Sequence, residues 1–245
     1  MSITIVGHRG ARGEAPENTL AGFVRARELR LPEVELDVRL SQDGELIVLH
    51  DKTLERTTGA TGTSLDYSAA QLGRLDARAS FPRWPEPAGV PTLAAVLDAG
   101  APDLRYQLEV KGESLPLLKQ LAAKLAQLIH ARALEQQVVV TSGHAGFLAH
   151  FGRLEPALKR GYIAEFRHQQ PLLRARRLGV DWLIVHYPLV TPTLMAKARA
   201  LGLGVSVWTV NDLAVAEKLV SLGVTSLITD FPSAFQHHFG ARCSR

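Results

Sequence analysis

The feature that most constrains the fold is a regular alternation of short β-rich runs with amphipathic helical runs along most of the chain. The pattern predicts strands at 2–7, 33–40, 45–50, 105–112, 137–142, 158–164, 181–187, 204–210 and 224–230. It predicts helices at 19–29, 92–100, 115–134, 146–154, 170–179, 191–202 and 212–223, and the last strand is followed by "PSAFQHHF". Such alternation is typical of a parallel sheet covered by helices.

The number of repeats favours one architecture. About eight major β–α steps in a chain of this length predict a closed (β/α)₈ barrel, the TIM barrel of the α/β class. A doubly wound open sheet is the alternative. That fold would call for a glycine-rich GxGxxG turn after a strand, and the sequence contains none.

One stretch, residues 51–91, breaks the alternation. It is rich in Gly, Thr and Pro and contains the basic and aromatic run "FPRWPEP". We interpret it as a small insertion or long loop without a core of its own. The whole chain, residues 1–245, is then predicted to be a single catalytic domain, since this length is ordinary for one α/β barrel.

Composition restricts the partners. The 28 Lys and Arg against 24 Asp and Glu give a net charge of +4, and the basic residues are scattered along the chain. This mild excess suits a protein with an anionic small-molecule substrate, and it also fits weak nucleic-acid binding or no charged partner at all. Because the basic residues are scattered and not clustered, no nucleic-acid partner is expected. It does not decide between a monomer and a homodimer.

The predicted location is cytoplasmic. The only cysteine is Cys243, so no internal disulfide can form, which fits a reducing compartment. The first residues, "MSITIVGHRG", lack the basic start and apolar run of a signal peptide. No apolar run reaches the roughly 18 residues of a bilayer span, so no stable membrane insertion is expected.

Polar residues gather where the predicted strands end. In a (β/α)₈ barrel the chemistry takes place at the carboxyl ends of the strands. Polar or aromatic side chains suited to catalysis or binding occur at these ends on five different predicted strands. They are His8, Glu35, Asp37, His50, Glu109, Lys111 and Trp208.

Two pairs of charged residues have the spacing of strand neighbours on one face. Glu35 and Asp37 flank Leu36, and Glu109 and Lys111 are also two residues apart. Alternation places each pair on one face, about 6.6 Å apart along the strand, and turns Leu36 toward the helices. The alternatives are a solvated edge strand for the first pair and a simple buried ion pair for the second. The apolar flanks favour a functional site inside the barrel.

Two histidines stand out from the others. His8 and His50 each end a predicted strand, and each is followed by a charged residue, Arg9 or Asp51. His186 also ends a strand and is a weaker candidate for the rim of the site. The glycines around Arg9 are expected to allow a tight backbone turn.

These residues lie in motifs that resemble a known family. The chain resembles the glycerophosphodiester phosphodiesterases of the bacterial cytosolic type, whose fold is a (β/α)₈ barrel. The resemblance runs from residue 8 to residue 232 and includes "HRGARGEAPENT", "ELDVRLSQDGELIVLHDKTLERTTGATG", "PTLAAVLD", "LEVKGE", "VWTVND" and "ITDFP". The stretch "TSGHAGF" departs from the family pattern at a turn that would border the pocket.

The resemblance implies a role for each candidate residue. His8 and His50 match a general acid/base pair, and Glu35, Asp37 and Glu109 match ligands of a divalent metal ion. Arg9 and Lys111 match residues that hold the phosphate, while Trp208 matches an aromatic near the glycerol end of the substrate. Residues 51–91 match a small insertion beside the mouth of the site.

The chemistry is consistent with these roles. Cleavage of a phosphodiester needs a base for the nucleophile and an acid for the leaving alkoxide, and two histidines can supply both. Three carboxylates without a thiolate suit Mg²⁺ or Ca²⁺. The carboxylates contribute −3, and Arg9 and Lys111 contribute +2, so the site alone carries −1. A divalent ion would make it +1 and match one diester.

The expected activity is hydrolysis of glycerophosphodiesters, the deacylated phospholipids, to sn-glycerol 3-phosphate and an alcohol. A lysophospholipase D or phospholipase C-like activity on lipids is the alternative, and would require an exposed apolar rim, for which "FPRWPEP" is the candidate. A non-catalytic binding barrel is disfavoured because every expected catalytic position is present.

The sequence also bears on the nucleophile. Thr209 follows Trp208 and is predicted to face away from the site, and Cys243 lies beyond the last predicted strand. With no side-chain nucleophile at a matched position, the 2-hydroxyl of the substrate glycerol is predicted to attack phosphorus first, before water opens the cyclic phosphate.

Overall fold

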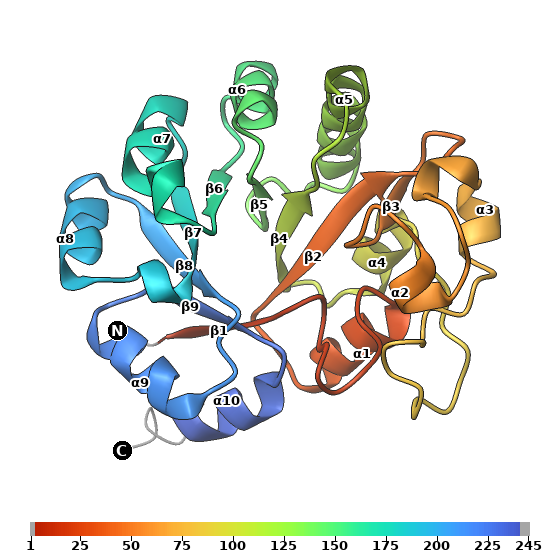
Figure 1. Ribbon diagram of the computed structural model, residues 1–245, viewed down its shortest axis with the longest axis horizontal. Helices are drawn as coiled ribbons and strands as arrows, with labels where there is room; N and C mark the ends of the chain where they lie inside the picture. Colours follow the sequence, from red (N-terminus) through yellow and green to blue (C-terminus); the bar gives the residue numbers. More distant parts are fainter. Residues whose placement is uncertain (1–2, 241–245) are drawn as a thin grey trace.

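Eight parallel strands close into a barrel at the centre of the molecule (Figure 1). The computed structural model describes residues 3–240. β1 pairs with β2 on one side and with β9 on the other, which closes the ring. The predicted (β/α)₈ barrel is therefore confirmed. Its strands are β1 (Thr4–Gly7), β2 (Glu33–Leu40), β4 (Arg105–Val110), β5 (Val138–Ser142), β6 (Arg160–Ala164), β7 (Trp182–His186), β8 (Gly204–Trp208) and β9 (Ser226–Thr229).

One predicted strand does not belong to the ring. β3 (Leu46–Val48) is shorter than the predicted strand 45–50 and pairs antiparallel with β2, Val38 opposite Val48. The short connection explains this orientation. Only residues 41–44 separate the predicted strands 33–40 and 45–50, whereas a crossover to a parallel strand needs about a dozen residues. His50 accordingly lies in the loop beyond β3 and not at the end of a barrel strand.

Helices cover the outside of the ring (Figure 1). α1 starts where the sequence indicates, because the Thr19 hydroxyl caps it by accepting a hydrogen bond from the Gly22 backbone N–H. α5 ends before its predicted limit, since Ala133 has a left-handed backbone. The outer helices are α1 (Leu20–Glu28), α4 (Leu93–Ala99), α5 (Leu115–Ala131), α6 (Ala145–Leu154), α7 (Pro171–Leu178), α8 (Pro192–Ala200), α9 (Leu213–Ser221) and α10 (Pro232–Gly240). The turns η2 (Arg167–Gln169) and η3 (Tyr187–Leu189) precede α7 and α8.

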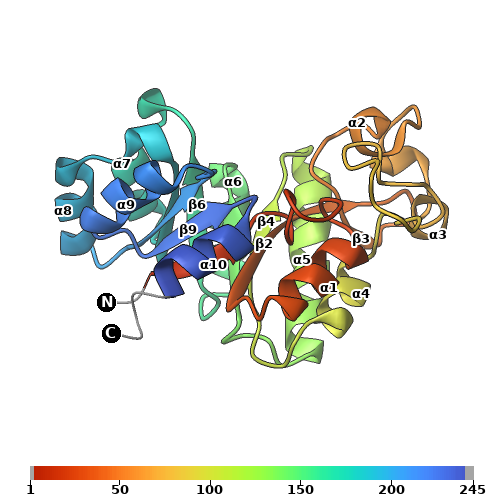
Figure 2. The same cartoon turned by 90° about the horizontal axis from the view of Figure 1, so that it is seen from below.

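The insertion at residues 51–91 has more structure than its sequence pattern predicted. It contains α2 (Glu55–Thr58), η1 (Ser64–Asp66) and α3 (Ala69–Leu72), and Figure 2 shows these elements on one side of the barrel. Four of its buried apolar residues pack with Ile47 of β3 and with Leu49, which precede the insertion. Six buried apolar residues form a separate small cluster: Ile47, Leu49, Leu54, Leu72, Ala77 and Val90.

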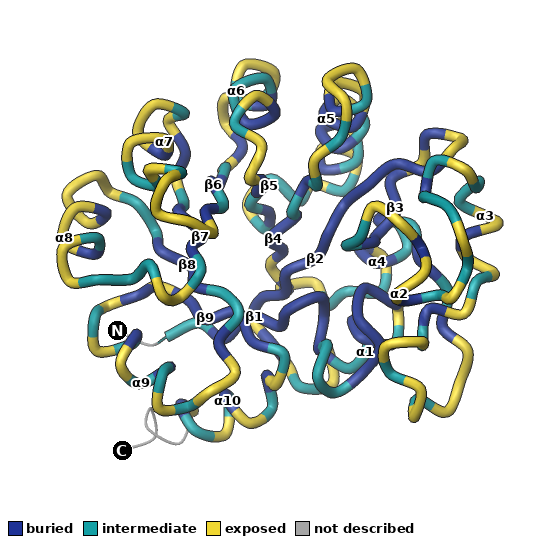
Figure 3. The backbone as a smooth tube through the Cα atoms, viewed as in Figure 1, coloured by how far each residue is buried: buried dark blue, intermediate teal, exposed yellow. Residues whose placement is uncertain are grey.

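The two faces of the barrel strands differ in chemistry. Residues that point outward, such as Leu36 and Val110, are buried in the main core beneath the helices, as alternation predicts. The inward face carries an apolar cluster of Val6, Ile184 and Ile228, together with buried polar residues. Figure 3 shows the strands buried and the outer helices exposed on their solvent side. The carboxyl end of the barrel interior is thus the place where polar side chains collect.

Two predictions concern parts of the chain at or near the termini. Ser2, in the first predicted strand, and Cys243 lie outside the described residues. Within residues 3–240, none of the helices combines the length and the apolar character that crossing a bilayer requires.

Candidate active site

A cavity of about 570 Å³ opens at the carboxyl ends of the barrel strands. Asp37 is not among the residues that line it and is only 1% exposed. Every other residue predicted for the site lines the cavity, so the structure brings the predicted set together. These lining residues are His8, Arg9, Glu35, His50, Glu109, Lys111 and Trp208.

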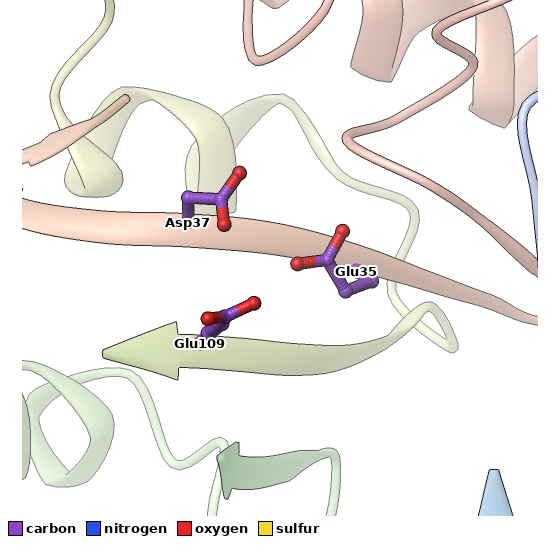
Figure 4. A group of neighbouring side chains, drawn as sticks. All are labelled: Glu35, Asp37 and Glu109. Atoms are coloured by element: carbon purple, nitrogen blue, oxygen red, sulfur yellow. The ribbon is translucent and has the colours of Figure 1, made fainter. Parts of the chain in front are cut away.

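Three carboxylates converge at the centre of the site (Figure 4). Glu35 and Asp37 project from β2, and Glu109 from the adjacent strand β4, where it pairs in register with Asp37. One oxygen of each side chain lies within 4.8 Å of the corresponding oxygens of the other two. The spacing of two residues on one strand therefore produces the shared face that the sequence predicted, and the neighbouring strand supplies the third carboxylate.

Asp37 is the most deeply held of the three. Its Oδ2 accepts a hydrogen bond from Asn18 Nδ2 at 2.8 Å, and Arg9 Nε lies 3.3 Å from the same oxygen. Lys111 Nζ lies 3.3 Å from its Oδ1 and donates to Glu109 at 2.7 Å. Burial alone would raise the pKa of Asp37, but Lys111 and Arg9 outweigh burial and hold it below its usual range. Asp37 is therefore ionised at neutral pH.

The other two carboxylates behave in the opposite way. Burial raises the pKa of Glu35 well above its ordinary value, and repulsion from Asp37 and Glu109 adds to the effect. Burial also raises the pKa of Glu109, although Lys111 opposes it. Asp37 Oδ1 is buried without a hydrogen-bond partner among the described residues. A hard divalent cation would relieve this repulsion and would give Asp37 Oδ1, which lies 3.3 Å from Lys111 Nζ, a further partner, so the residues present fit such an ion.

His8 lies inside the barrel mouth, at the end of β1. Its Nδ1 is 2.6 Å from Oδ1 of Asp230, and its Nε2 is 3.9 Å from Glu35 Oε2. Burial raises the pKa of Asp230, but the hydrogen bond and charge of His8, the hydrogen bond from Asn211 and the charge of Arg12 together outweigh burial and leave the pKa low. An ionised carboxylate can only accept, so Nδ1 carries a proton and Nε2 faces the carboxylate cluster. Burial lowers the pKa of His8, which favours a neutral ring with a free Nε2.

His50 approaches the cavity from the loop after β3. Its Nδ1 is 2.7 Å from Oδ1 of Asp51, which mirrors the arrangement at His8. Arg39 donates hydrogen bonds to the backbone carbonyl of His50 from Nε at 3.1 Å and Nη2 at 2.9 Å. Burial lowers the pKa of His50. Both histidines thus line the cavity while a carboxylate holds Nδ1.

Arg9 is fixed in a strained loop. Its φ of 50° lies in the left-handed region, which is uncommon for a residue other than glycine. Its Nη1 donates to Glu17 Oε1 at 2.7 Å, and its backbone N–H donates to Glu35 Oε2 at 3.1 Å. Gly10 follows with φ 88°, and a Cβ there would lie 2.8 Å from the Gly22 backbone of α1. The glycine therefore allows the loop to pack closely on the helix.

The side of the cavity at the end of β8 differs partly from the sequence prediction. Trp208 ends β8, its ring centroid is 5.3 Å from that of His186, and its buried Nε1 has no hydrogen-bond partner among the described residues. Thr209 was expected to face away, but it lines the cavity. That expectation was wrong because β8 ends at Trp208, so strand alternation does not extend to the next residue.

Comparison with known proteins now identifies the family. The model of the glycerophosphoryl diester phosphodiesterase family matches residues 8–234. The chain belongs to this family. The glycerophosphodiester phosphodiesterase of Caldanaerobacter subterraneus subsp. tengcongensis is 31% identical over 233 residues, which cover 95% of this chain and 96% of the relative. A glycerophosphodiester phosphodiesterase of Bacillus subtilis is 30% identical, over 95% of this chain and 85% of the relative.

Solved structures agree with this assignment. A phosphodiesterase of Oleispira antarctica, in complex with the product sn-glycerol-3-phosphate, superposes with a TM-score of 0.85 at 27% identity and covers 96% of each chain. A putative family member from Silicibacter pomeroyi has a TM-score of 0.91, covers 98% of this chain and 94% of its own, and is 24% identical, a likeness that establishes the fold.

Several residues of this phosphodiesterase-family site were not predicted to take part. Asp230 directly follows the last barrel strand, and that position was a usable signal for a partner of His8. Glu17 and Asn18 lie in the "PENT" loop and are each 4% exposed. No periodic pattern marks a loop residue as buried, so these two could be placed only with the fold in hand. Arg56 of the insertion is a fourth such residue.

Proposed function

We propose that this chain is a metal-dependent phosphodiesterase that hydrolyses glycerophosphodiesters to sn-glycerol 3-phosphate and an alcohol. The observation that carries the proposal is the convergence, in one cavity, of three carboxylates with two carboxylate-held histidines. Family membership supports the reaction class. The Oleispira antarctica structure, with sn-glycerol-3-phosphate as product, supports the substrate class.

Glu35, Asp37 and Glu109 would hold the cation. Mg²⁺ or Ca²⁺ suits an all-oxygen set of this charge, and when bound such an ion stabilises negative charge on phosphoryl oxygens. Lys111 neutralises part of the cluster through Glu109 and Asp37. The three carboxylates counted together with Arg9, Lys111 and one divalent ion have a net positive charge, which suits the binding of a phosphodiester monoanion.

His8 and His50 would exchange protons with the reacting groups. In each ring a carboxylate fixes the tautomer and leaves Nε2 free toward the cavity. One ring in its neutral form accepts the proton of the attacking hydroxyl, and the other in its protonated form donates to the leaving alkoxide. Arg9 would hold a phosphoryl oxygen beside His8, with Lys111 on the other side. Trp208 would pack against the glycerol end of the substrate.

The attacking group in this proposal is the 2-hydroxyl of the glycerol. Its oxygen forms a bond to phosphorus, the bond from phosphorus to the leaving alcohol breaks, and water then opens the cyclic phosphate. An internal hydroxyl can have an effective molarity of about 10⁵ M or more, which favours it over water.

Thr209 lines the cavity and is a rival nucleophile. A 2-deoxy analogue should bind but turn over far more slowly, and Thr209→Val should keep its kcat. Comparable turnover of the deoxy analogue would mean direct attack by water.

Product analysis tests the proposed reaction. Wild-type protein loaded with Mg²⁺ or Ca²⁺ should convert glycerophosphocholine to sn-glycerol 3-phosphate and choline, observed by ³¹P NMR together with a choline assay. Phosphocholine and glycerol as products would instead indicate a phospholipase C-like bond cleavage. No conversion of glycerophosphocholine or of other glycerophosphodiesters would contradict the proposal.

A lipid-directed activity is the second candidate. The run "FPRWPEP" does not supply its apolar rim, because Trp84 and Pro87 line a separate cavity beside α1. Three exposed aromatic residues nevertheless follow barrel strands at the end where the catalytic cavity opens: Phe166, Tyr187 and Phe231. Release of choline from lysophosphatidylcholine at a rate near that from glycerophosphocholine would favour this second function.

A further inference from the structure

One arginine of the insertion contacts two carboxylates, one of which binds Arg9 and the other His50. Arg56 lies on α2, and its Nη1 and Nη2 donate to Glu17 Oε2 at 2.8 Å and Oε1 at 2.7 Å. Its Nε donates to Oδ2 of Asp51. A single planar guanidinium therefore uses three N–H groups on two carboxylates, a geometry that lysine cannot reproduce.

The first carboxylate leads to Arg9. The Glu17 side chain is 2% exposed, and its Oε1 accepts from Arg9 Nη1 at 2.7 Å. Burial raises the pKa of Glu17, but hydrogen bonds from Arg56 and the charge of Arg9 lower it to about 2. Glu17 therefore stays ionised at neutral pH. Arg56 binds both of its oxygens, and Arg12 Nε lies 3.1 Å from Oε2, so Arg56 is the residue that holds both ends of the carboxylate in contact with Arg9.

The second carboxylate leads to His50. Asp51 contacts His50 Nδ1 through Oδ1 at 2.7 Å while Arg56 binds its Oδ2. The Asp51 side chain is 26% exposed, so burial alone does not restrict its rotation. Arg56 supplies the contact that keeps Oδ1 toward the imidazole.

We propose that Arg56 is a positioning residue that fixes His50 and Arg9 relative to each other, and so sets the proton-transfer group against the phosphate-holding group. This inference rests on the proposed function, since that function gives His50 and Arg9 their roles. The continuous chain of contacts runs His50, Asp51, Arg56, Glu17 and Arg9. Its middle member belongs to the insertion and does not line the catalytic cavity.

The two branches predict separable kinetic effects. Loss of the Asp51 branch misorients His50 and should lower kcat, while loss of the Glu17 branch loosens Arg9 and should raise KM. Arg56→Gln should therefore lower kcat about 10-fold and raise KM at least about 3-fold. Arg56→Lys should recover only part of either effect, because one ammonium cannot hold both carboxylates.

A matched control is available in the same insertion. Arg78 binds Asp76 through Nη2 at 2.6 Å and Nε at 2.7 Å and donates to the Trp84 carbonyl, with no contact to the site. Arg78→Gln removes a comparable ion pair. It should leave kcat and KM for glycerophosphocholine within about 2-fold of wild type.

Double variants separate positioning from a general effect on the fold. In an Asp51→Asn background, Arg56→Gln should change kcat less than about 2-fold and still raise KM. In a Glu17→Gln background it should no longer raise KM but should still lower kcat. The experiment is steady-state hydrolysis of glycerophosphocholine with saturating metal, with the melting temperature of each variant recorded in parallel.

Three results would overturn the inference: kcat and KM of Arg56→Gln within 2-fold of wild type, equal losses in Arg56→Gln and Arg78→Gln, or effects that simply add in both double variants. Each requires an active wild type. An inactive wild type would instead contradict the proposed function itself, so the two failures are distinguishable.

Discussion

The two histidines of the site share a chemical arrangement but differ in how the fold builds it. Each has Nδ1 held by a carboxylate, Asp230 for His8 and Asp51 for His50. The His8 side chain is 8% exposed and its partner is 222 residues away, whereas the His50 side chain is 32% exposed and its partner is the next residue. Closure of the barrel makes the first pair, and a local loop makes the second.

The two histidine–carboxylate pairs therefore depend on different surroundings. The His8–Asp230 pair is less accessible to water, so solvent replaces a lost carboxylate there less readily and the imidazole depends more on Asp230. Around His50, water can reach the ring, and orientation depends on contacts made by the insertion and by Arg39. We therefore expect disruption of the buried pair to cost more activity than disruption of the exposed pair.

The largest effect should come from removal of either imidazole. His8→Ala and His50→Ala should each lower kcat for glycerophosphocholine at least about 10²-fold, because each removes a proton-transfer group. His8→Ala should also lower the melting temperature more, since it leaves Asp230 partly buried without its partner. Circular dichroism checks that both variants fold. Near-normal kcat in both would show that the assignment is wrong.

A smaller and unequal effect should follow changes in the two carboxylate partners. Asp230→Asn should lower kcat about 10²-fold, and Asp51→Asn only about 10-fold, because solvent can partly replace the exposed partner. The comparison needs steady-state kinetics on both variants at one pH and one metal concentration. Equal losses, or a larger loss in Asp51→Asn, would contradict the role given to burial.

The smallest effect concerns acid stability. Glu17 has a pKa of about 2 in the folded protein, below its ordinary value, so it stabilises the fold above about pH 4.5 and loses this contribution as the pH falls toward 2. Wild type should therefore be more stable than Glu17→Gln at pH 6, with a gap that narrows in acid. Melting temperatures of both proteins from pH 6 to pH 2.5 measure this gap. A gap that stays constant would mean that Glu17 does not stabilise through its charge.

The strand residues of the site could be predicted because strand geometry is regular. The period of two along a strand places Glu35 and Asp37 on one face of β2, and the register of β2 with β4 brings Glu109 beside them. The same rule failed for Thr209, one residue beyond the end of β8, and for the orientation of β3. Regular spacing predicts side-chain direction only while the backbone remains extended and paired.

The loop residues of the site could not be predicted in the same way. Glu17 is buried against Arg56 of the insertion and Asn18 against Asp37 of β2, and no local pattern encodes these contacts. Arg56 reaches the site from a helix of only four residues within a segment that had appeared irregular. The extent of the single catalytic domain, the cytoplasmic location and the choice between monomer and homodimer stay predictions.

The central claim is that the carboxylate cluster holds a cation without which the two histidines cannot act. The most direct measurement follows release of sn-glycerol 3-phosphate from glycerophosphocholine by wild type and by Glu35→Gln, before chelation, in chelator, and after Mg²⁺ or Ca²⁺ is returned. Wild type should lose its activity in chelator and recover it with metal, while Glu35→Gln should stay far less active throughout. Full activity of Glu35→Gln in chelator would contradict the account.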